Sequence, residues 1–143
     1  MSPTNMKTRQ IAFAAALALA LFATGVQAGA VIVSKTSPLV PMGTDDARRV
    51  FLGLQRNVGD QTVTVVFQRN GAAREDFNNK VLGKNGSELT AYMAARIFAG
   101  RAVPPTEVGG DDDVKRILNG NPGAIGYIND SSVDDSVRVL LRY

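Results

Sequence analysis

The chain has 143 residues, of which 45% are apolar and 20% charged, with 16 basic and 13 acidic side chains. It contains no histidine, cysteine or tryptophan. This composition predicts one globular domain and excludes disulfides, thiolate nucleophiles, Ser-His or Cys-His pairs and the usual zinc and haem ligands. A binding protein without a cofactor is therefore favoured over an enzyme. No run of basic residues interleaved with aromatics occurs, so nucleic acid is not an expected partner.

Residues 1–28 have the pattern of an export signal. A basic start is followed by a predominantly apolar run over 11–26, and Val26-Gln27-Ala28 fits the small-x-small cleavage rule. A membrane anchor is the alternative, but the uninterrupted apolar part is shorter than the roughly 20 residues that span a bilayer. We expect cleavage after Ala28, a mature domain over 29–143, and a periplasmic or secreted location.

The mature part alternates strands and helices, identified by β-branched runs, helical spacing of apolar residues, and glycine or proline at the boundaries. In chain order, the first half is expected to form a strand over 30–34, a loop over 36–43, a helix over 44–52 capped by Thr44, a polar connection over 54–61 with a turn at Gly59-Asp60, and a strand over 62–67. The second half is expected to form a helix over 72–82, a helix capped by Ser87 and ending at Gly100, a loop at 103–105, a helix over 111–118, a turn over 119–123, and strands over 124–128 and 137–141. This order predicts an α/β domain in which helices sandwich a mixed β-sheet.

The turn after the strand over 62–67 is the main candidate site. Arg69-Asn70-Gly71 ends the strand and leads into a helix that carries Arg74 near its start. The start of a helix exposes backbone N–H groups and a partial positive charge, and guanidinium groups suit tetrahedral oxyanions. The alternative is a tight turn that binds nothing, with Arg69 on the surface and Arg74 in a helix ion pair.

A second polar loop follows the first strand. Ser34, Lys35, Thr36 and Ser37 offer three hydroxyls and an ammonium group, which suit either an oxyanion site or an ordinary loop. In a parallel sheet both loops would lie at one edge, where α/β proteins usually bind ligands. Asp111-Asp112-Asp113 is interpreted as the solvated start of a helix and not as a cation site.

Four segments together carry a family resemblance: 44–53 (TDDARRVFLG), 63–77 (VTVVFQRNGAAREDF), 81–83 (VLG) and 121–127 (NPGAIGY). In their order along the chain and in their residues, these segments resemble the phosphate-binding proteins of bacterial ABC transporters, in particular the short, exported members. The resemblance implies a type II periplasmic-binding-protein fold, phosphate or a related oxyanion as ligand, and an inner-membrane ABC permease as partner. It places Arg69 at the position of the family's loop arginine and Gly71 at that of a loop glycine.

Two departures from this family pattern support an alternative function. Ala72 and Ala73 stand where the family has hydroxyl side chains, and the mature chain has roughly half the length of a two-lobed binding protein. The alternative is a protein-interaction module that kept the fold and lost the ligand, with an exposed apolar face that could also form a homodimer. An enzyme is the third hypothesis and is disfavoured, because no nucleophile or acid/base pair stands out.

Overall fold

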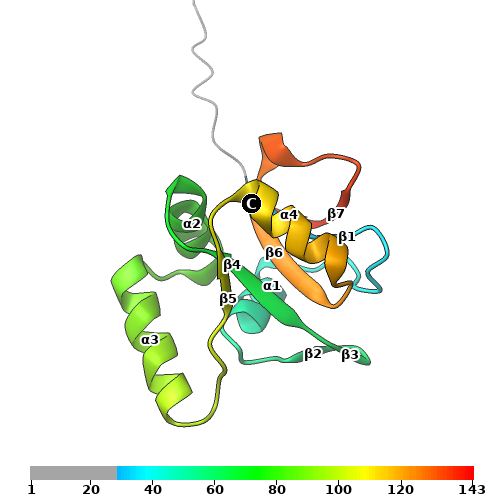
Figure 1. Ribbon diagram of the computed structural model, residues 1–143. Coiled ribbons are helices and arrows are strands. Elements are labelled where there is room, and N and C mark those ends of the chain that lie inside the picture. The colour runs from blue at the N-terminus through cyan, green and yellow to red at the C-terminus, as the bar shows by residue number, and fades with distance from the viewer. Residues whose placement is uncertain (1–28) are drawn as a thin grey trace, which may run out of the picture.

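A computed structural model describes residues 29–143, so the export signal expected over 1–28 lies outside the described residues. A five-stranded sheet in the order β5-β4-β6-β1-β7 forms the centre of the domain, and helices cover both of its faces (Figure 1). Over the described range, no helix has the length and apolar character needed to span a membrane.

In chain order the elements are β1 (Gly29–Ser34), α1 (Thr44–Phe51), β2 (Asn57–Val58), β3 (Gln61–Thr62), β4 (Thr64–Gln68), α2 (Ala72–Phe77), the π-helical turn η1 (Asn78–Leu82), α3 (Gly86–Phe98), β5 (Thr106–Val108), α4 (Asp111–Gly120), β6 (Ala124–Asn129), the 3-10 turn η2 (Asp130–Ser132) and β7 (Val137–Arg142). The expected mixed α/β sandwich is thereby confirmed.

The sheet has a parallel half and an antiparallel half. Strand β4 pairs in parallel with β5 and with β6, with Thr64 opposite Ala124. Strand β1 pairs antiparallel with β6, where Ile32 lies opposite Gly126, and antiparallel with β7. The carboxyl end of β1 therefore lies at the end of the sheet where β4 and β6 begin, opposite the carboxyl ends of those two strands.

Each face of the sheet has its own apolar core. On the face covered by α1, α2 and α3, the rings of Phe51 and Phe77 meet edge to face with centroids 4.7 Å apart, and Tyr127 stacks on Phe77 at 3.9 Å. On the other face, Val114 and Leu118 of α4 pack on β1, β4 and β6. A Cβ on Gly126 would lie 2.6 Å from Val114, so glycine is required where α4 crosses β6.

Several helix details differ from the sequence-based expectations. Asn85, and not Ser87, caps α3, because its side chain accepts a hydrogen bond from the Glu88 amide. Thr44 is the first residue of α1 and makes no side-chain capping bond. The helix expected over 72–82 changes to a π-helical turn after Phe77.

The remaining differences concern short or exposed segments. The three-residue strand β5 was not expected, since two prolines precede it and it has little apolar character. The polar connection folds into a small hairpin of β2 and β3 around the expected turn at Gly59-Asp60. Phe98 shares the near-helical spacing of the buried Leu89 and Met93, but its side chain is 97% exposed. It lies half a turn from Leu89 around the helix, so it points away from the core.

Candidate functional site

The two polar loops that the sequence singled out do not form one site. Ser34, Thr36 and Ser37 follow β1, which runs antiparallel to β6 and so ends at the opposite edge from the turn after β4. The two loops would lie together only if β1 ran parallel to β4 and β6, and the antiparallel direction of β1 separates them. Their hydroxyls make contacts within the loop: Ser34 Oγ lies 3.3 Å from Thr36 Oγ1, and Ser37 Oγ accepts a bond from the Leu39 amide.

The turn after β4 presents Arg69 and Asn70 to solvent. The Arg69 amide donates to the Val108 carbonyl at 2.8 Å, which fixes the turn against β5. Its guanidinium makes a single long contact of 3.4 Å to the Glu107 carbonyl. Gly71 follows with φ of +105°, a conformation that only glycine adopts without strain, and α2 begins at the next residue. The sharp bend at Gly71 thus directs the start of α2 back over the end of β4.

Arg74 stabilises this turn from within. Its Nη1 donates to the carbonyls of Gln68 and Arg69, both at 2.9 Å, and lies 3.3 Å from Glu107 Oε1. The side chain is 18% exposed. Its guanidinium is therefore engaged with the strand end and with β5, as in the alternative interpretation of this turn, although its carboxylate partner is on a strand and not on the helix.

An open hollow of about 740 Å³ lies between the start of α2 and the start of α4. Gly71, Ala72 and Ala73 line its α2 side. The first N–H groups of a helix have no intrahelical acceptor, and within residues 29–143 these three amides donate to no other group. Of the residues expected to bind a ligand, Gly71 alone lines this hollow; Arg69 and Asn70 stand on the exposed turn beside it.

The floor of the hollow is a hydrogen-bond network around Asp111, the first residue of α4. Its Oδ1 accepts from Gln68 Nε2 at 2.6 Å. Its Oδ2 accepts from the backbone amide and the side-chain amide of Asn129, at 3.2 and 3.0 Å, and from Ser132 Oγ at 2.6 Å. This one carboxylate therefore links β4, β6 and η2.

This network corrects the interpretation of the acidic triplet. Asp112, with its side chain 91% exposed, does lie on a solvated face, whereas Asp111 is half-buried and fully engaged. The sequence signal was present: Gln68 and Asn129 end two strands, and polar residues at the carboxyl ends of parallel neighbours meet at one edge. It was missed because the strands expected over 62–67 and 124–128 each stop one residue before these side chains.

Tyr127 supports the network by holding Gln68 in place. Its hydroxyl accepts the Gln68 amide at 3.0 Å, and its carbonyl accepts Gln68 Nε2 at 3.1 Å. Burial raises the pKa of the Tyr127 phenol to about 12. Gln68 is thus held by hydrogen bonds of its backbone amide and its side-chain amide and by its place in β4, so the floor of the hollow is preformed.

The rim of the hollow carries both signs of charge. Asp113 and Arg116 pair at 2.8 Å across one turn of α4, and Asp112 stands beside them. In the part of the chain that is described, no group of three or more acidic residues is arranged to hold a metal ion. The hollow therefore offers backbone donors on the α2 side and carboxylate acceptors on the α4 side.

The fold is similar to that of solved phosphate-transport receptors. A phosphate ABC transporter substrate-binding protein from Clostridium perfringens, solved with bound phosphate, aligns at a TM-score of 0.64 and 26% identity over 80% of this chain and 44% of its own. An ABC-type phosphate transport receptor from Vibrio cholerae aligns at 0.63 and 22% identity, over 80% and 45%. PstS from Borrelia burgdorferi aligns at 0.58 and 13% identity, over 80% and 47%.

These likenesses confirm, at the level of fold, the resemblance found in the sequence. The chain spans less than half the length of each of these three proteins. No protein-family model matches the sequence, and no curated protein matches it either.

Proposed function

We propose that this protein is an exported, non-enzymatic solute-binding domain that takes phosphate or a related oxyanion in the hollow between α2 and α4. The observation that carries the proposal is the group of unpartnered amides at Gly71, Ala72 and Ala73, at the carboxyl end of a parallel strand. The fold likeness to a phosphate-bound transport protein supports the same ligand class. An ABC permease would be the partner of such a domain.

The charges on the rim favour an oxyanion that keeps a proton. Asp112 and Asp113 repel a dianion, whereas a P–OH group can donate a hydrogen bond to a carboxylate. Hydrogen phosphate has such a donor and sulfate has none at neutral pH. We therefore expect phosphate to bind in preference to sulfate, and more tightly as the pH falls and the monoanion becomes dominant.

Binding is expected to be weak compared with that of an enclosed site. The hollow is open, Arg74 is already engaged, and Ala72 and Ala73 provide no hydroxyl donors. Arg69 is the arginine whose guanidinium is free enough to reach an anion at the rim, since its one contact is long. Asn70 stands next to it on the same exposed turn and offers a side-chain amide donor.

An NMR titration of the ¹⁵N-labelled protein with phosphate tests the proposal. Saturable shifts are expected at the amides of Gly71, Ala72 and Ala73. Arg69→Ala should weaken binding, and Arg49→Ala, which removes an exposed arginine of α1, should not. If phosphate shifts no amide at the start of α2, or if both variants behave alike, this site is not an oxyanion site.

One observation favours the second candidate function, a protein-interaction module. Phe98 is 97% exposed, Val103 65% and Leu54 53%. A protein partner or a second copy of the chain would cover them. Light scattering of the wild-type protein and of Phe98→Ser tests for the second copy: a dimer that the substitution dissociates would support it, and a monomer in both would exclude it.

A further inference from the structure

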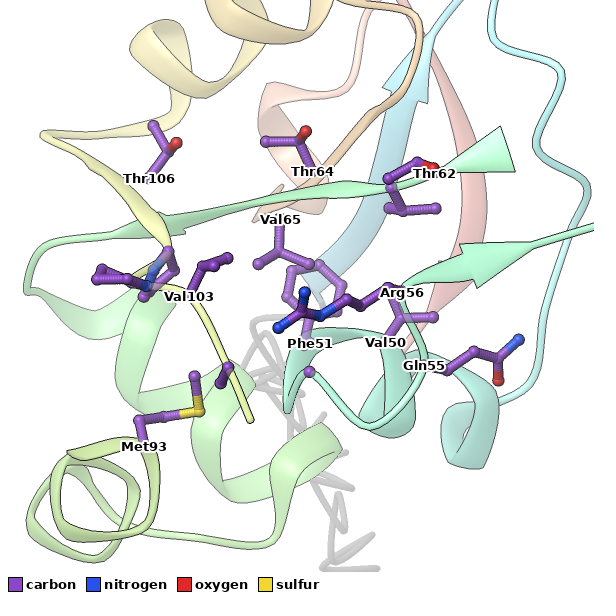
Figure 2. A pocket seen from close by; sticks show the side chains of 15 residues that line it. Val50, Phe51, Gln55, Arg56, Thr62, Thr64, Val65, Met93, Val103 and Thr106 are labelled. Carbon is purple, nitrogen blue, oxygen red and sulfur yellow. The ribbon is translucent and has the colours of Figure 1, made fainter. Parts of the chain in front are cut away.

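A second pocket, of about 230 Å³, lies away from the hollow, at the amino-terminal end of β4 (Figure 2). The end of α1, the start of β4 and the linker from α3 to β5 enclose it. Its walls are apolar: Phe51 is fully buried, Met93 is 9% exposed, and Val65 is half-buried. Val103 and the two prolines after it close the side formed by the linker. The pocket is independent of the proposed phosphate site, which lies at the other end of β4.

Arg56 is the one charged residue among those that line this pocket. Figure 2 shows its side chain extending beside Phe51 and Val65. Its carbonyl accepts the Val63 amide at 2.8 Å, which holds its backbone beside the start of β4. Across residues 29–143 its guanidinium has no ion-pair or hydrogen-bond partner, in contrast to Arg48, which is paired with Asp45.

An unpaired guanidinium beside an apolar wall defines the chemistry of a ligand. A carboxylate matches the fork of the guanidinium with two parallel hydrogen bonds. The apolar walls favour a ligand that also has an apolar group, since burying apolar surface is favourable. Phosphate fits poorly, because a single arginine and apolar walls cannot replace its hydration. The volume is below the roughly 300–1,000 Å³ of sites for drug-sized ligands, so the ligand is small.

We propose that this pocket binds a small apolar carboxylate, with the ligand's carboxylate on Arg56 and its body against Phe51, Val65 and Met93. Phenylacetate has the required charge and an aromatic body of suitable size. The site requires no part of the hollow at the other end of β4.

A ¹⁵N NMR titration of the protein with phenylacetate tests this proposal. Two compounds serve as controls. Phenylacetamide has the same aromatic group without the negative charge, and inorganic phosphate has negative charge without an apolar group. We expect saturable shifts around Val65, Val103 and Thr106 with phenylacetate, and weaker shifts with phenylacetamide. Phosphate should leave these amides unchanged, whatever it does at the start of α2.

Two matched variants complete the test. Arg56→Gln should weaken phenylacetate binding by about tenfold or more, the usual effect of removing a charge-assisted pair. Arg49→Gln, also an exposed arginine but not part of the pocket, should leave it unchanged. The proposal is overturned if phenylacetate gives no saturable shift, if phenylacetamide binds equally well, or if Arg56→Gln binds as tightly as the wild-type protein.

Discussion

Replacing Asp111 by alanine removes the acceptor on which the floor of the hollow depends. Four hydrogen bonds end on this carboxylate: one from Gln68, two from Asn129 and one from Ser132. Hydrogen bonds to charged groups contribute about 1.5–3 kcal/mol each to stability. Asp111 is only half-buried, so water can take over part of the loss. We therefore expect Asp111→Ala to lower the free energy of unfolding by about 2–4 kcal/mol.

Asp112→Ala is the matched control for this substitution. Both residues lie in the first turn of α4, so each variant loses a similar helix-dipole interaction. Asp112 is 91% exposed and reaches only Lys115, at 3.7 Å, so its loss should cost less than about 1 kcal/mol. Urea unfolding followed by circular dichroism measures both variants. Equal destabilisation of the two variants would contradict this role of Asp111, because it would show that the network adds nothing beyond a charge at the start of the helix.

Three further predictions concern the turn and its support. Gly71→Ala should destabilise by about 1–3 kcal/mol, because φ is +105° there. Gly43→Ala, which is also at a helix N-cap but at φ of −82° and in open space, should destabilise less; urea unfolding compares them. Arg74→Ala should destabilise by about 1–3 kcal/mol, since it leaves two carbonyls of the turn without a donor, and a melting curve matching that of the wild-type protein would argue against this role. The pKa of the Tyr127 phenol is raised from 10.0 to about 12. Its contribution to the free energy of unfolding is therefore complete below about pH 10, and about 3 kcal/mol of that free energy is lost as the pH rises through about 12. Urea unfolding at a series of alkaline pH values should show this fall, and Tyr127→Phe, which cannot ionise, should show a smaller one.

The fold was predictable because its signals are local. Strand β1, strand β4 and the helix starts follow from apolar runs and glycine boundaries, and the two-sided cover follows from their alternation. Strand direction is not a local property. The sequence predicts a mixed sheet but does not say which strands are parallel. Strand β1 inserts between β6 and β7 and is antiparallel to both, which places Ser34 and Ser37 at the end of the sheet opposite the turn after β4.

The site was only partly predictable for a related reason. The turn at Arg69 and Gly71 follows from sequence, because glycine between a strand and a helix allows the positive φ that a sharp turn needs. The partners of Asp111 come from three elements up to 43 positions away, and only the parallel pairing of β4 and β6 brings them together. The ion pair of Arg74 also depends on tertiary structure, since Glu107 becomes its neighbour only when β5 pairs with β4 in the sheet.

Isothermal titration calorimetry with phosphate and with sulfate tests whether the hollow binds a protonated oxyanion. Measurements at about pH 6 and about pH 8 vary the protonation of phosphate but leave sulfate a dianion. If the hollow is a site for a protonated oxyanion, phosphate binds saturably and more tightly at the lower pH, while sulfate gives little or no heat. If neither anion binds to the folded protein, or if sulfate binds as well as phosphate at both pH values, the proposed function is contradicted.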